Sequence, residues 1–265
     1  MRHRWIRAAT MAVAAAVSFA AGACGSNAPS TPGPSTTTTG VTGNITVFAA
    51  ASLTESFTQI GKDFEAANPG SKVVFNFGAS SSLATQINEG APADVFASAS
   101  PATMKTVTDA GNADGTPAVF VKNQLVIAVP KGNPKGITTL ADLAKPDVKV
   151  ALCAEQVPCG AAAKKALQAA GVTVTPVTLE QDVKQALSKA KLGEVDAALV
   201  YRTDAKAAAA DVDGIEFPES ASAINDYPIA VLKSASNEAA ARAFVSYISS
   251  APAKAVLSHA GFQAP

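Results

Sequence analysis

Two serines stand where a β-rich run of the sequence passes into an amphipathic helix. Ser52 follows the run 45–51, and Ser80 follows the run 73–79. The first turn of a helix has main-chain N–H groups without acceptors and carries partial positive charge. Two such helix ends, each with a hydroxyl group, form a site suited to a small oxyanion. The alternative interpretation is that each serine only caps its own helix, as serines at such positions often do.

Three further segments place donors at similar joints between strands and helices. Segment 157–160 precedes an alanine-rich helix, Tyr201 ends the apolar run 195–201, and segment 180–184 begins another helix. A dianion that enters a cleft loses its hydration and needs several donors in exchange. Hydrogen bonds to an ionised acceptor contribute about 1.5–3 kcal/mol each, so neutral donors suffice without a cationic side chain. For Tyr201 the alternative is an ordinary aromatic residue at a strand end.

Other ionisable residues near these joints are expected to have structural roles. Asp94 is interpreted as a turn or cap residue, and Asp182 as an N-cap that faces its own helix, because a carboxylate repels an anion. His259 is interpreted as a surface residue near the end of the last helix. A secreted serine hydrolase needs a nucleophile, a base and an orienting acid. No Gly-x-Ser-x-Gly motif occurs and His259 is a poor candidate for the base, so we expect that the protein is not an enzyme.

The N-terminal residues have the features of an export signal. Three arginines precede the apolar stretch 10–23, which is too short to span a membrane. Small residues directly before Cys24 resemble a bacterial lipobox, so we expect removal of residues 1–23 and lipidation of Cys24. Ordinary cleavage near Ala23 is the alternative. Residues 24–43 are rich in Ser, Thr, Pro and Gly, which predicts a flexible tether between the membrane and the folded part.

The remaining two cysteines, Cys153 and Cys159, form an even pair if Cys24 carries lipid. In an oxidising compartment such a pair indicates a disulfide. A metal-binding pair is the alternative, but His259 is the only histidine outside the predicted leader.

The charge balance argues against nucleic acid as a partner. Removal of Arg2, Arg4 and Arg7 from the 21 basic residues leaves 18 against 21 acidic ones, a net charge of −3. No basic stripe is present to bind phosphates along a backbone. Bulk charge does not attract an anion to this chain either, so a binding site must do so locally.

Residues 44–265 alternate between strand-like and helical stretches, which predicts an α/β fold with mainly parallel sheets flanked by helices. The expected strands are 44–50, 72–77, 93–98, 118–121, 125–129, 148–152, 173–178, 196–201, 215–217 and 228–233. The expected helices are 53–67, 81–89, 101–111, 139–144, 160–170, 181–192, 203–209, 237–249 and 251–259.

Two strand-like runs look like crossings between two lobes. We expect lobe I to comprise 44–124 and 227–265, and lobe II to comprise 125–226, joined by a two-strand hinge. A single continuous sheet is the alternative. Ligands of open α/β sheets bind beyond the carboxyl ends of the strands, and clefts between domains are common binding sites.

The sequence resembles the molybdate-binding proteins of ABC importers, a group of the bacterial extracellular solute-binding proteins. Six segments carry this resemblance, in the expected order along nearly all of the folded part. They are 47–53, 77–83, 90–98, 157–160, 196–201 and 227–230.

The resemblance implies a two-domain, type II periplasmic-binding fold that closes on molybdate or tungstate. It implies hydroxyl donors from Ser52, Ser80 and Tyr201, and main-chain N–H donors from Cys159 and Val183. Many relatives carry alanine at the position of Cys159, but a main-chain donor does not depend on that side chain. The molybdenum would be held only as its oxyanion, with no other metal and no cofactor.

The resemblance also implies partners and a location. The expected partners are the membrane permease and the ATPase of an ABC importer, and the expected location is the outer face of the cell membrane, as a monomer. The alternative ligands are sulfate, thiosulfate and phosphate. A cage of fixed donors sized for molybdate leaves donors unpaired around the smaller sulfate ion, so we expect selectivity by size.

Overall fold

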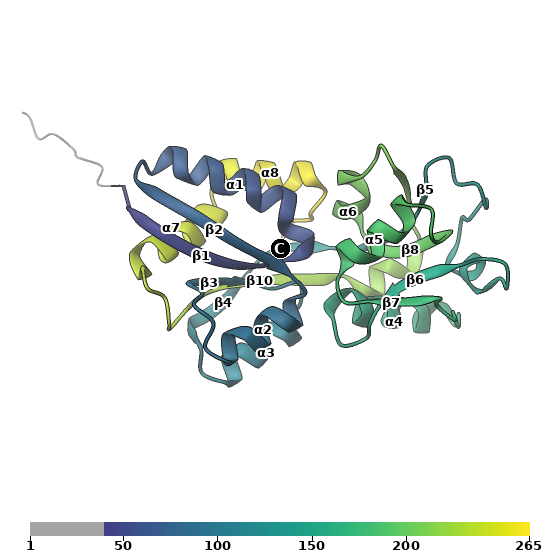
Figure 1. Ribbon diagram of the computed structural model, residues 1–265, viewed down its shortest axis with the longest axis horizontal. Coiled ribbons are helices and arrows are strands. Elements are labelled where there is room, and N and C mark those ends of the chain that lie inside the picture. Colours follow the sequence, from purple (N-terminus) through teal and green to yellow (C-terminus); the bar gives the residue numbers. More distant parts are fainter. Residues whose placement is uncertain (1–39) are drawn as a thin grey trace, which may run out of the picture. The chain divides into compact units, whose positions relative to one another are not determined.

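The computed structural model describes residues 40–265. The predicted leader, Cys24 and most of the predicted tether lie outside the described residues. Two five-stranded sheets, each with helices packed against it, make up the described part (Figure 1). Within residues 40–265, no helix has both the length and the apolar character needed to cross a membrane.

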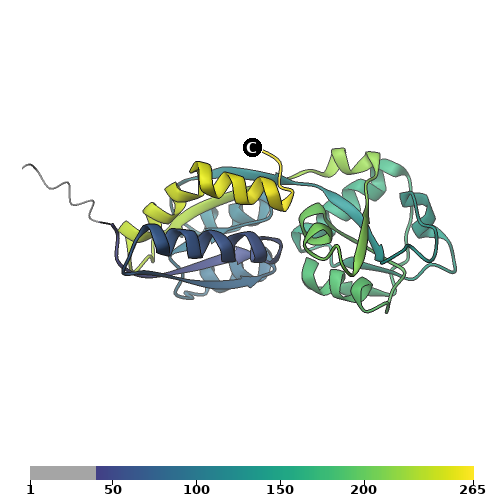
Figure 2. The same ribbon diagram turned by 90° about the horizontal axis from the view of Figure 1, so that it is seen from above.

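The first sheet has the strand order β2-β1-β3-β10-β4. Its strands are β1 (Gly43–Ala50), β2 (Ser71–Gly78), β3 (Val95–Ala97), β4 (Ala113–Asn123) and β10 (Asn225–Leu232). Its helices are η1 (Ala51–Leu53), α1 (Thr54–Ala67), α2 (Ser80–Asn88), α3 (Pro101–Asp109), α7 (Glu238–Ile248) and α8 (Ala251–Ala260). Helices α1 and α8 lie on one side of this sheet, and α2 and α3 lie on the other (Figures 1 and 2).

The second sheet has the strand order β7-β6-β8-β5-β9. Its strands are β5 (Leu125–Pro130), β6 (Val150–Cys153), β7 (Thr178–Glu180), β8 (Ala197–Tyr201) and β9 (Val212–Ile215). Its helices are η2 (Leu140–Ala144), α4 (Pro158–Ala170), α5 (Val183–Lys191), α6 (Arg202–Ala207) and η3 (Pro218–Ala223).

Strand β1 shows why helices cover both faces of the first sheet. Successive side chains of a strand point to opposite faces. Val47 packs into one apolar cluster with Phe57 of α1, whereas its neighbour Phe48 packs into another with Leu83 of α2. All of these side chains are buried, so a strand with apolar residues in both alternations needs a helical layer on each side.

The expected α/β architecture with mainly parallel sheets flanked by helices is confirmed, because four of the five strands in each sheet share one direction. In each sheet three neighbouring strands run parallel, and the other two pairings are antiparallel. Strand β10 enters the first sheet from the second half of the molecule and therefore runs against β3 and β4. Strand β5 likewise runs against β8 and β9.

Two predicted strands are misplaced. The alternating run 173–178 is irregular up to Val177, and β7 begins only at Thr178. Pro176 has no N–H group to donate to a ladder, which explains why the strand starts after it. The predicted strand 215–217 is observed earlier, as β9, because Val212–Ile215 pair with β5.

The chain passes between the two sheets without a long linker. Only Gln124 separates the end of β4 from the start of β5. Within the part of the chain that the structure describes, no strand is shared by both sheets, so the alternative of a single continuous sheet is wrong. The assignment of 44–124 with 227–265 and of 125–226 to two lobes stays a prediction.

Candidate functional site

A small cavity lies where strands of both sheets end. Its lining residues follow the carboxyl ends of β1, β2 and β3 in the first sheet and of β6, β7 and β8 in the second. They are Ala50, Ala51, Ser52, Gly78, Ala79, Ser80, Ala99, Val157, Pro158, Cys159, Asp182, Val183 and Tyr201. The carboxyl edge of a sheet is where open α/β folds place their ligands.

The cavity brings all five predicted site residues together. Ser52 and Ser80 come from the first sheet, whereas Cys159, Val183 and Tyr201 come from the second. Each of the five is at most 4% exposed. The volume of the cavity is about 20 Å³. A cavity needs roughly 10–15 Å³ to hold one water molecule. A small ion fits these dimensions, and an organic ligand does not.

Neither serine is an N-cap, so the alternative interpretation of Ser52 and Ser80 is wrong. Ser52 lies inside η1, and Ser80 is the first helical residue of α2, without a capping hydrogen bond from a side chain in either helix. The hydroxyl of Ser52 lies 2.8 Å from the hydroxyl of Tyr227. Ser80 Oγ accepts the N–H of Ala99 at 3.0 Å. Each serine oxygen is thus engaged with the protein, and its hydrogen can be directed into the cavity.

The two main-chain donors lie in the first turns of α4 and α5. Val183 is the first helical residue of α5, and Cys159 is the second of α4, after Pro158. N–H groups at these positions have no acceptor within their helix. The Asp182 carboxylate accepts the N–H groups of Lys184 and Gln185, which confirms that this residue caps its own helix.

The start of α4 packs unusually closely against the loop that follows β6. A side-chain carbon on Gly160 would lie 1.9 Å from the carbonyl oxygen of Ala154, so only glycine fits there. The sulfur atoms of Cys153 and Cys159 lie 2.13 Å apart, and the two Cα atoms are separated by 5.8 Å. These contacts fix the position of the Cys159 N–H group relative to β6.

The hydroxyl of Tyr201 is oriented by a neighbouring amide. Asn225 Nδ2 lies 2.6 Å from the Tyr201 hydroxyl and 2.9 Å from the carbonyl oxygen of Ala99. A carbonyl only accepts, so the NH₂ group of Asn225 faces both atoms and donates to the Tyr201 oxygen. The Tyr201 hydrogen is left for another acceptor. Complete burial raises the pKa of Tyr201 well above 10, so this hydrogen is retained.

Three polar residues beside the site were given no site role in the sequence analysis: Asn123 and Tyr227, which are buried, and Asn225, which is half-buried. Asn123 and Asn225 face each other as a pair of β4 and β10. Tyr227 is fully buried, and its ring packs edge-on against Tyr201 at 6.0 Å. The signal available in the sequence was an asparagine shortly before each of the two predicted crossing strands, 125–129 and 228–233.

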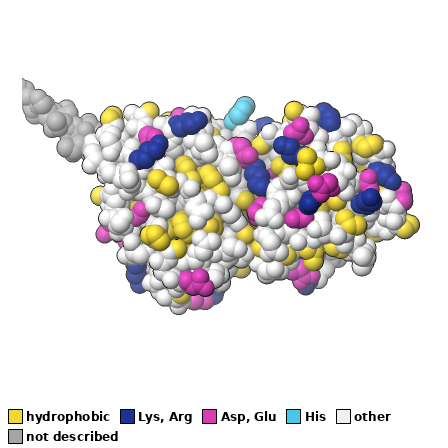
Figure 3. All heavy atoms as spheres, viewed as in Figure 1, with side chains coloured by type: hydrophobic (Ala, Val, Ile, Leu, Met, Phe, Trp, Pro, Cys, Tyr) yellow, Lys and Arg dark blue, Asp and Glu magenta, His cyan; other side chains and the backbone are white. Residues whose placement is uncertain are grey.

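The cavity itself is lined by neither lysine nor arginine, and Asp182 is its one charged residue. A cluster of charges next to Val183 in the sequence is centred on Lys184. Its ammonium contacts Glu55 of α1 at 2.8 Å and Asp204 of α6, which is fully buried, at 2.9 Å. Burial raises the pKa of Asp204 although Lys184 opposes this effect. On the face shown in Figure 3, basic and acidic side chains are interspersed.

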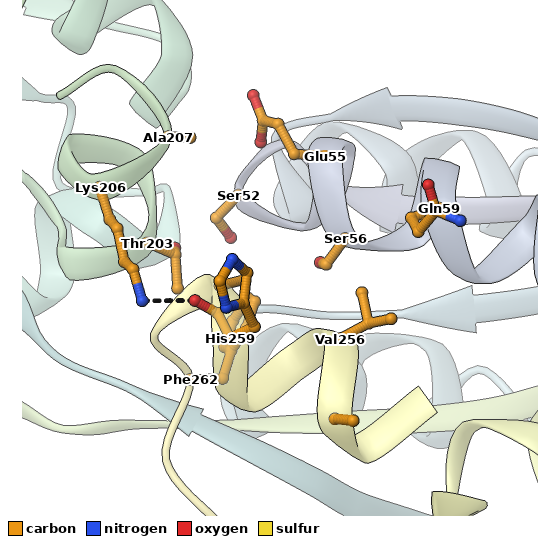
Figure 4. A pocket seen from close by; sticks show the side chains of 12 residues that line it. Ser52, Glu55, Ser56, Gln59, Thr203, Lys206, Ala207, Val256, His259 and Phe262 are labelled. Atoms are coloured by element: carbon orange, nitrogen blue, oxygen red, sulfur yellow. Dashed lines mark hydrogen bonds between the residues drawn. The ribbon is translucent and has the colours of Figure 1, made fainter. Parts of the chain in front are cut away.

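A larger cavity of about 600 Å³ lies on the other side of Ser52, between α1, α6 and α8 (Figure 4). His259 and Glu55 line it together with Ser52. A serine hydrolase would pair its serine with a histidine. The Ser52 hydroxyl instead pairs with Tyr227, and His259 is exposed at the end of α8, as expected.

Asp94 has the structural role expected for it, although it is more buried than a simple turn residue. Its carboxylate accepts the N–H groups of Thr46, Ser236 and Asn237. It thereby joins β1, the loop before β3 and the start of α7, away from the cavity.

Comparison with known proteins identifies the family. Residues 45–263 match the family of bacterial extracellular solute-binding proteins. The chain belongs to this family. It is a family of solute-binding proteins rather than of enzymes, and its members are extracellular.

The relatives of this solute-binding protein include the molybdate-binding protein ModA of Mycobacterium tuberculosis H37Rv. The two are 45% identical over 262 residues, which cover 99% of this chain and 100% of that protein.

Two solved structures share the fold of this solute-binding protein. The periplasmic molybdate-binding protein of Azotobacter vinelandii is 24% identical with a TM-score of 0.72, over 83% of this chain and 99% of that one. The sulfate-binding protein SubI of Mycobacterium tuberculosis is 20% identical with a TM-score of 0.71, over 83% and 86%.

Proposed function

We propose that this protein captures molybdate, and also tungstate, for an ABC importer. The observation that carries the proposal is the convergence of five neutral donor residues on one small cavity. The 45% identity to a protein named as molybdate-binding, over nearly the whole chain, supports the same ligand class.

In this proposal Ser52, Ser80 and Tyr201 donate their hydroxyl hydrogens to the oxyanion, and Cys159 and Val183 donate their main-chain N–H groups. Molybdenum is bound only as the oxyanion, and no cofactor takes part. Two donors come from the first sheet and three from the second, so the ion is surrounded only when the two lobes, 44–124 with 227–265 and 125–226, close on each other. Charge-assisted hydrogen bonds replace the lost water of the dianion.

The remaining parts of the proposal concern the exported protein. Cys153 and Cys159 form a disulfide that holds the donor loop, supported by the 2.13 Å separation of their sulfur atoms. Cys24 carries lipid and anchors the protein, a monomer, to the outer face of the membrane. There it delivers its ligand to the permease and the ATPase of the importer.

Sulfate is the second candidate ligand, because hydroxyl and N–H groups can donate hydrogen bonds to any tetrahedral dianion that fits. Calorimetric titration of the exported protein with molybdate, tungstate and sulfate separates the two. We expect molybdate and tungstate to bind with similar affinity and sulfate more weakly, since a smaller ion leaves donors unpaired. Sulfate binding as tight as molybdate binding would contradict the proposal.

A further inference from the structure

A chain of buried polar groups runs behind Ser52, on the side away from the small cavity. The Tyr227 hydroxyl oxygen lies 2.8 Å from Ser52 Oγ, and Asn123 Nδ2 lies 3.4 Å from the same hydroxyl oxygen. Tyr227 is 0% exposed and Asn123 is 1% exposed. Neither lines the small cavity, so any influence on a ligand there acts through residues that do, and Ser52 is the lining residue whose hydroxyl lies next to that of Tyr227.

The main chain fixes the orientation of the amide at the start of this hydrogen-bond chain. Asn123 Oδ1 accepts the N–H of Gln124 at 3.0 Å, so the NH₂ group of Asn123 is the one that faces Tyr227. Thr203 Oγ1, at 2.9 Å, is the second acceptor of that NH₂ group. An amide NH₂ group only donates, so the Tyr227 oxygen accepts from Asn123. Between Ser52 and Tyr227 either hydroxyl can donate. The direction that continues the chain from Asn123 has Tyr227 donating to Ser52, which leaves the Ser52 hydrogen for the cavity.

The surroundings keep a hydrogen on each oxygen of this chain. Burial raises the pKa of Tyr227 above its ordinary value of 10, so Tyr227 keeps its hydroxyl hydrogen. The Tyr227 ring is held edge-on between Tyr201, at 6.0 Å, and Phe262, at 5.5 Å. Its hydroxyl therefore has a fixed position relative to Ser52.

We propose that Tyr227, oriented by Asn123, is a positioning residue that makes Ser52 a hydrogen-bond donor toward the bound oxyanion. This inference rests on the proposed function. An anion at the end of such a chain polarises each bond in the same direction, which strengthens the contact. This hydrogen-bond chain also determines which anions bind, because Ser52 presents a hydrogen to the cavity rather than a lone pair. An oxyanion without hydrogens is accepted, whereas a protonated one finds no acceptor for its own hydrogen at Ser52.

A double-mutant cycle tests whether Tyr227 acts through Ser52. The variants are Tyr227→Phe, Ser52→Ala and the two combined, and the readout is the affinity for molybdate, tungstate and sulfate by calorimetry. We expect Tyr227→Phe to weaken binding about three- to tenfold when Ser52 is present, and less than about twofold in the Ser52→Ala background. The matched control is Tyr247→Phe, in α7, whose ring packs against Phe64 outside the site.

The outcomes separate the inference from the proposed function. Equal losses in both backgrounds, or no loss from Tyr227→Phe, would overturn the positioning role while leaving oxyanion binding intact. Failure of the wild-type protein to bind any of the three anions would overturn both. Because Tyr227→Phe keeps the ring that packs against Tyr201 and Phe262, we expect it to fold, and its melting temperature checks this directly.

Selectivity provides a second readout that a purely structural role would not change. The Tyr227→Phe variant leaves the Ser52 hydroxyl free to turn and accept a hydrogen. We expect the ratio of the affinities for molybdate and for inorganic phosphate, which is protonated at pH 6, to fall in this variant and to stay unchanged in Tyr247→Phe. An unchanged ratio in Tyr227→Phe would contradict the role in specificity.

Discussion

The two halves of the candidate site offer different kinds of donor to the same cavity. The half built on the first sheet contributes the side-chain hydroxyls of Ser52 and Ser80. The half built on the second contributes main-chain N–H groups at the starts of α4 and α5, together with the Tyr201 hydroxyl. A side-chain donor is lost by a single substitution, whereas a main-chain donor survives every substitution except proline.

This difference determines what keeps each half in place. The serines depend on hydrogen-bond partners behind them, since Ser52 pairs with Tyr227 and Ser80 accepts the N–H of Ala99. The N–H group of Cys159 depends instead on the path of the backbone, which is set by close packing at Gly160. The first half is therefore sensitive to side-chain chemistry, and the second, apart from the Tyr201 hydroxyl, to backbone geometry.

The largest expected effect comes from removing a donor of the first half. Ser52→Ala and Ser80→Ala should each weaken molybdate binding by about 1–3 kcal/mol, because a charge-assisted hydrogen bond is lost. Calorimetry measures the affinity, and circular dichroism checks that both variants fold. Ser82→Ala, at an exposed position of α2, is the matched control. Normal binding by both variants would show that the donors of the first half are assigned wrongly.

A backbone change should disturb the second half to a similar degree. In Gly160→Ala the new methyl group meets the carbonyl oxygen of Ala154, so the first turn of α4 must move. We expect the free energy of unfolding to fall by about 1–3 kcal/mol, as for other overpacked sites, and the affinity to fall with it. Urea denaturation and calorimetry measure the two effects. Ala161→Ser, at the next and exposed position, should change neither, and a wild-type result for Gly160→Ala would contradict this account.

Loss of the cysteine pair should separate stability from binding. Cys153→Ala combined with Cys159→Ala keeps the N–H group at position 159 but opens a loop with a sequence separation of 6. We expect the free energy of unfolding to fall by roughly 2 kcal/mol, with a much smaller change in affinity. When the wild-type protein is treated with an alkylating reagent, mass spectrometry should find neither Cys153 nor Cys159 alkylated. A loss of affinity as large as that of Ser52→Ala would show that the bridge, and not only the packing at Gly160, holds the Cys159 N–H group in place.

The ion pair between Glu55 and Lys184 tests how the halves are held together. Glu55→Gln removes the carboxylate of α1 but leaves Lys184 paired with Asp204. The Glu55 side chain is 53% exposed, so its ion pair contributes little. We expect the free-energy barrier to anion release to fall by only about 0.2–1 kcal/mol, and by less at high salt. Glu155→Gln is the control, because Glu155 pairs with Lys164 inside one half. Stopped-flow measurements showing equal release rates for both variants would contradict a link between the halves.

The smallest expected effect is that of pH on the hydroxyl donors. Burial raises the pKa of Tyr201 well above 10, so affinity should be unchanged between pH 7 and about 9. The raised folded-state pKa values of Tyr201 and Tyr227 contribute stability below the unfolded value of about 10, and this stability is lost as pH rises above it. Titrations and thermal melts along a pH series measure both quantities. A decline in affinity already at pH 8 would indicate that Tyr201 ionises within this range.

Much of the fold and of the candidate site could be predicted because both depend on local signals. The runs before Ser52 and Ser80 are apolar strands followed by helices, and the structure places both serines at those joints. The five site residues follow the carboxyl ends of strands, and the geometry of the sheets brings such ends together. The strand predicted at 173–178 was misplaced because the prediction gave more weight to the alternation of polar and apolar residues than to the missing N–H group of Pro176.

The residues behind the site could not be predicted in this way. Tyr227 meets Ser52 across 175 positions of sequence, and Asn123 meets Thr203 across 80. Such contacts are set by the pairing of β4 and β10 within the first sheet, for which a single sequence gives no local sign. The antiparallel direction of these strands has the same origin, since it depends on how the chain returns from the second half.

A crystal structure of the exported protein grown with molybdate would test the central claim most directly, because the anomalous signal of molybdenum locates the ion. We predict one ion in the small cavity, within hydrogen-bond distance of the hydroxyls of Ser52, Ser80 and Tyr201 and of the N–H groups of Cys159 and Val183. An ion bound in the larger cavity beside His259, or a small cavity without molybdenum at saturating ligand, would contradict it.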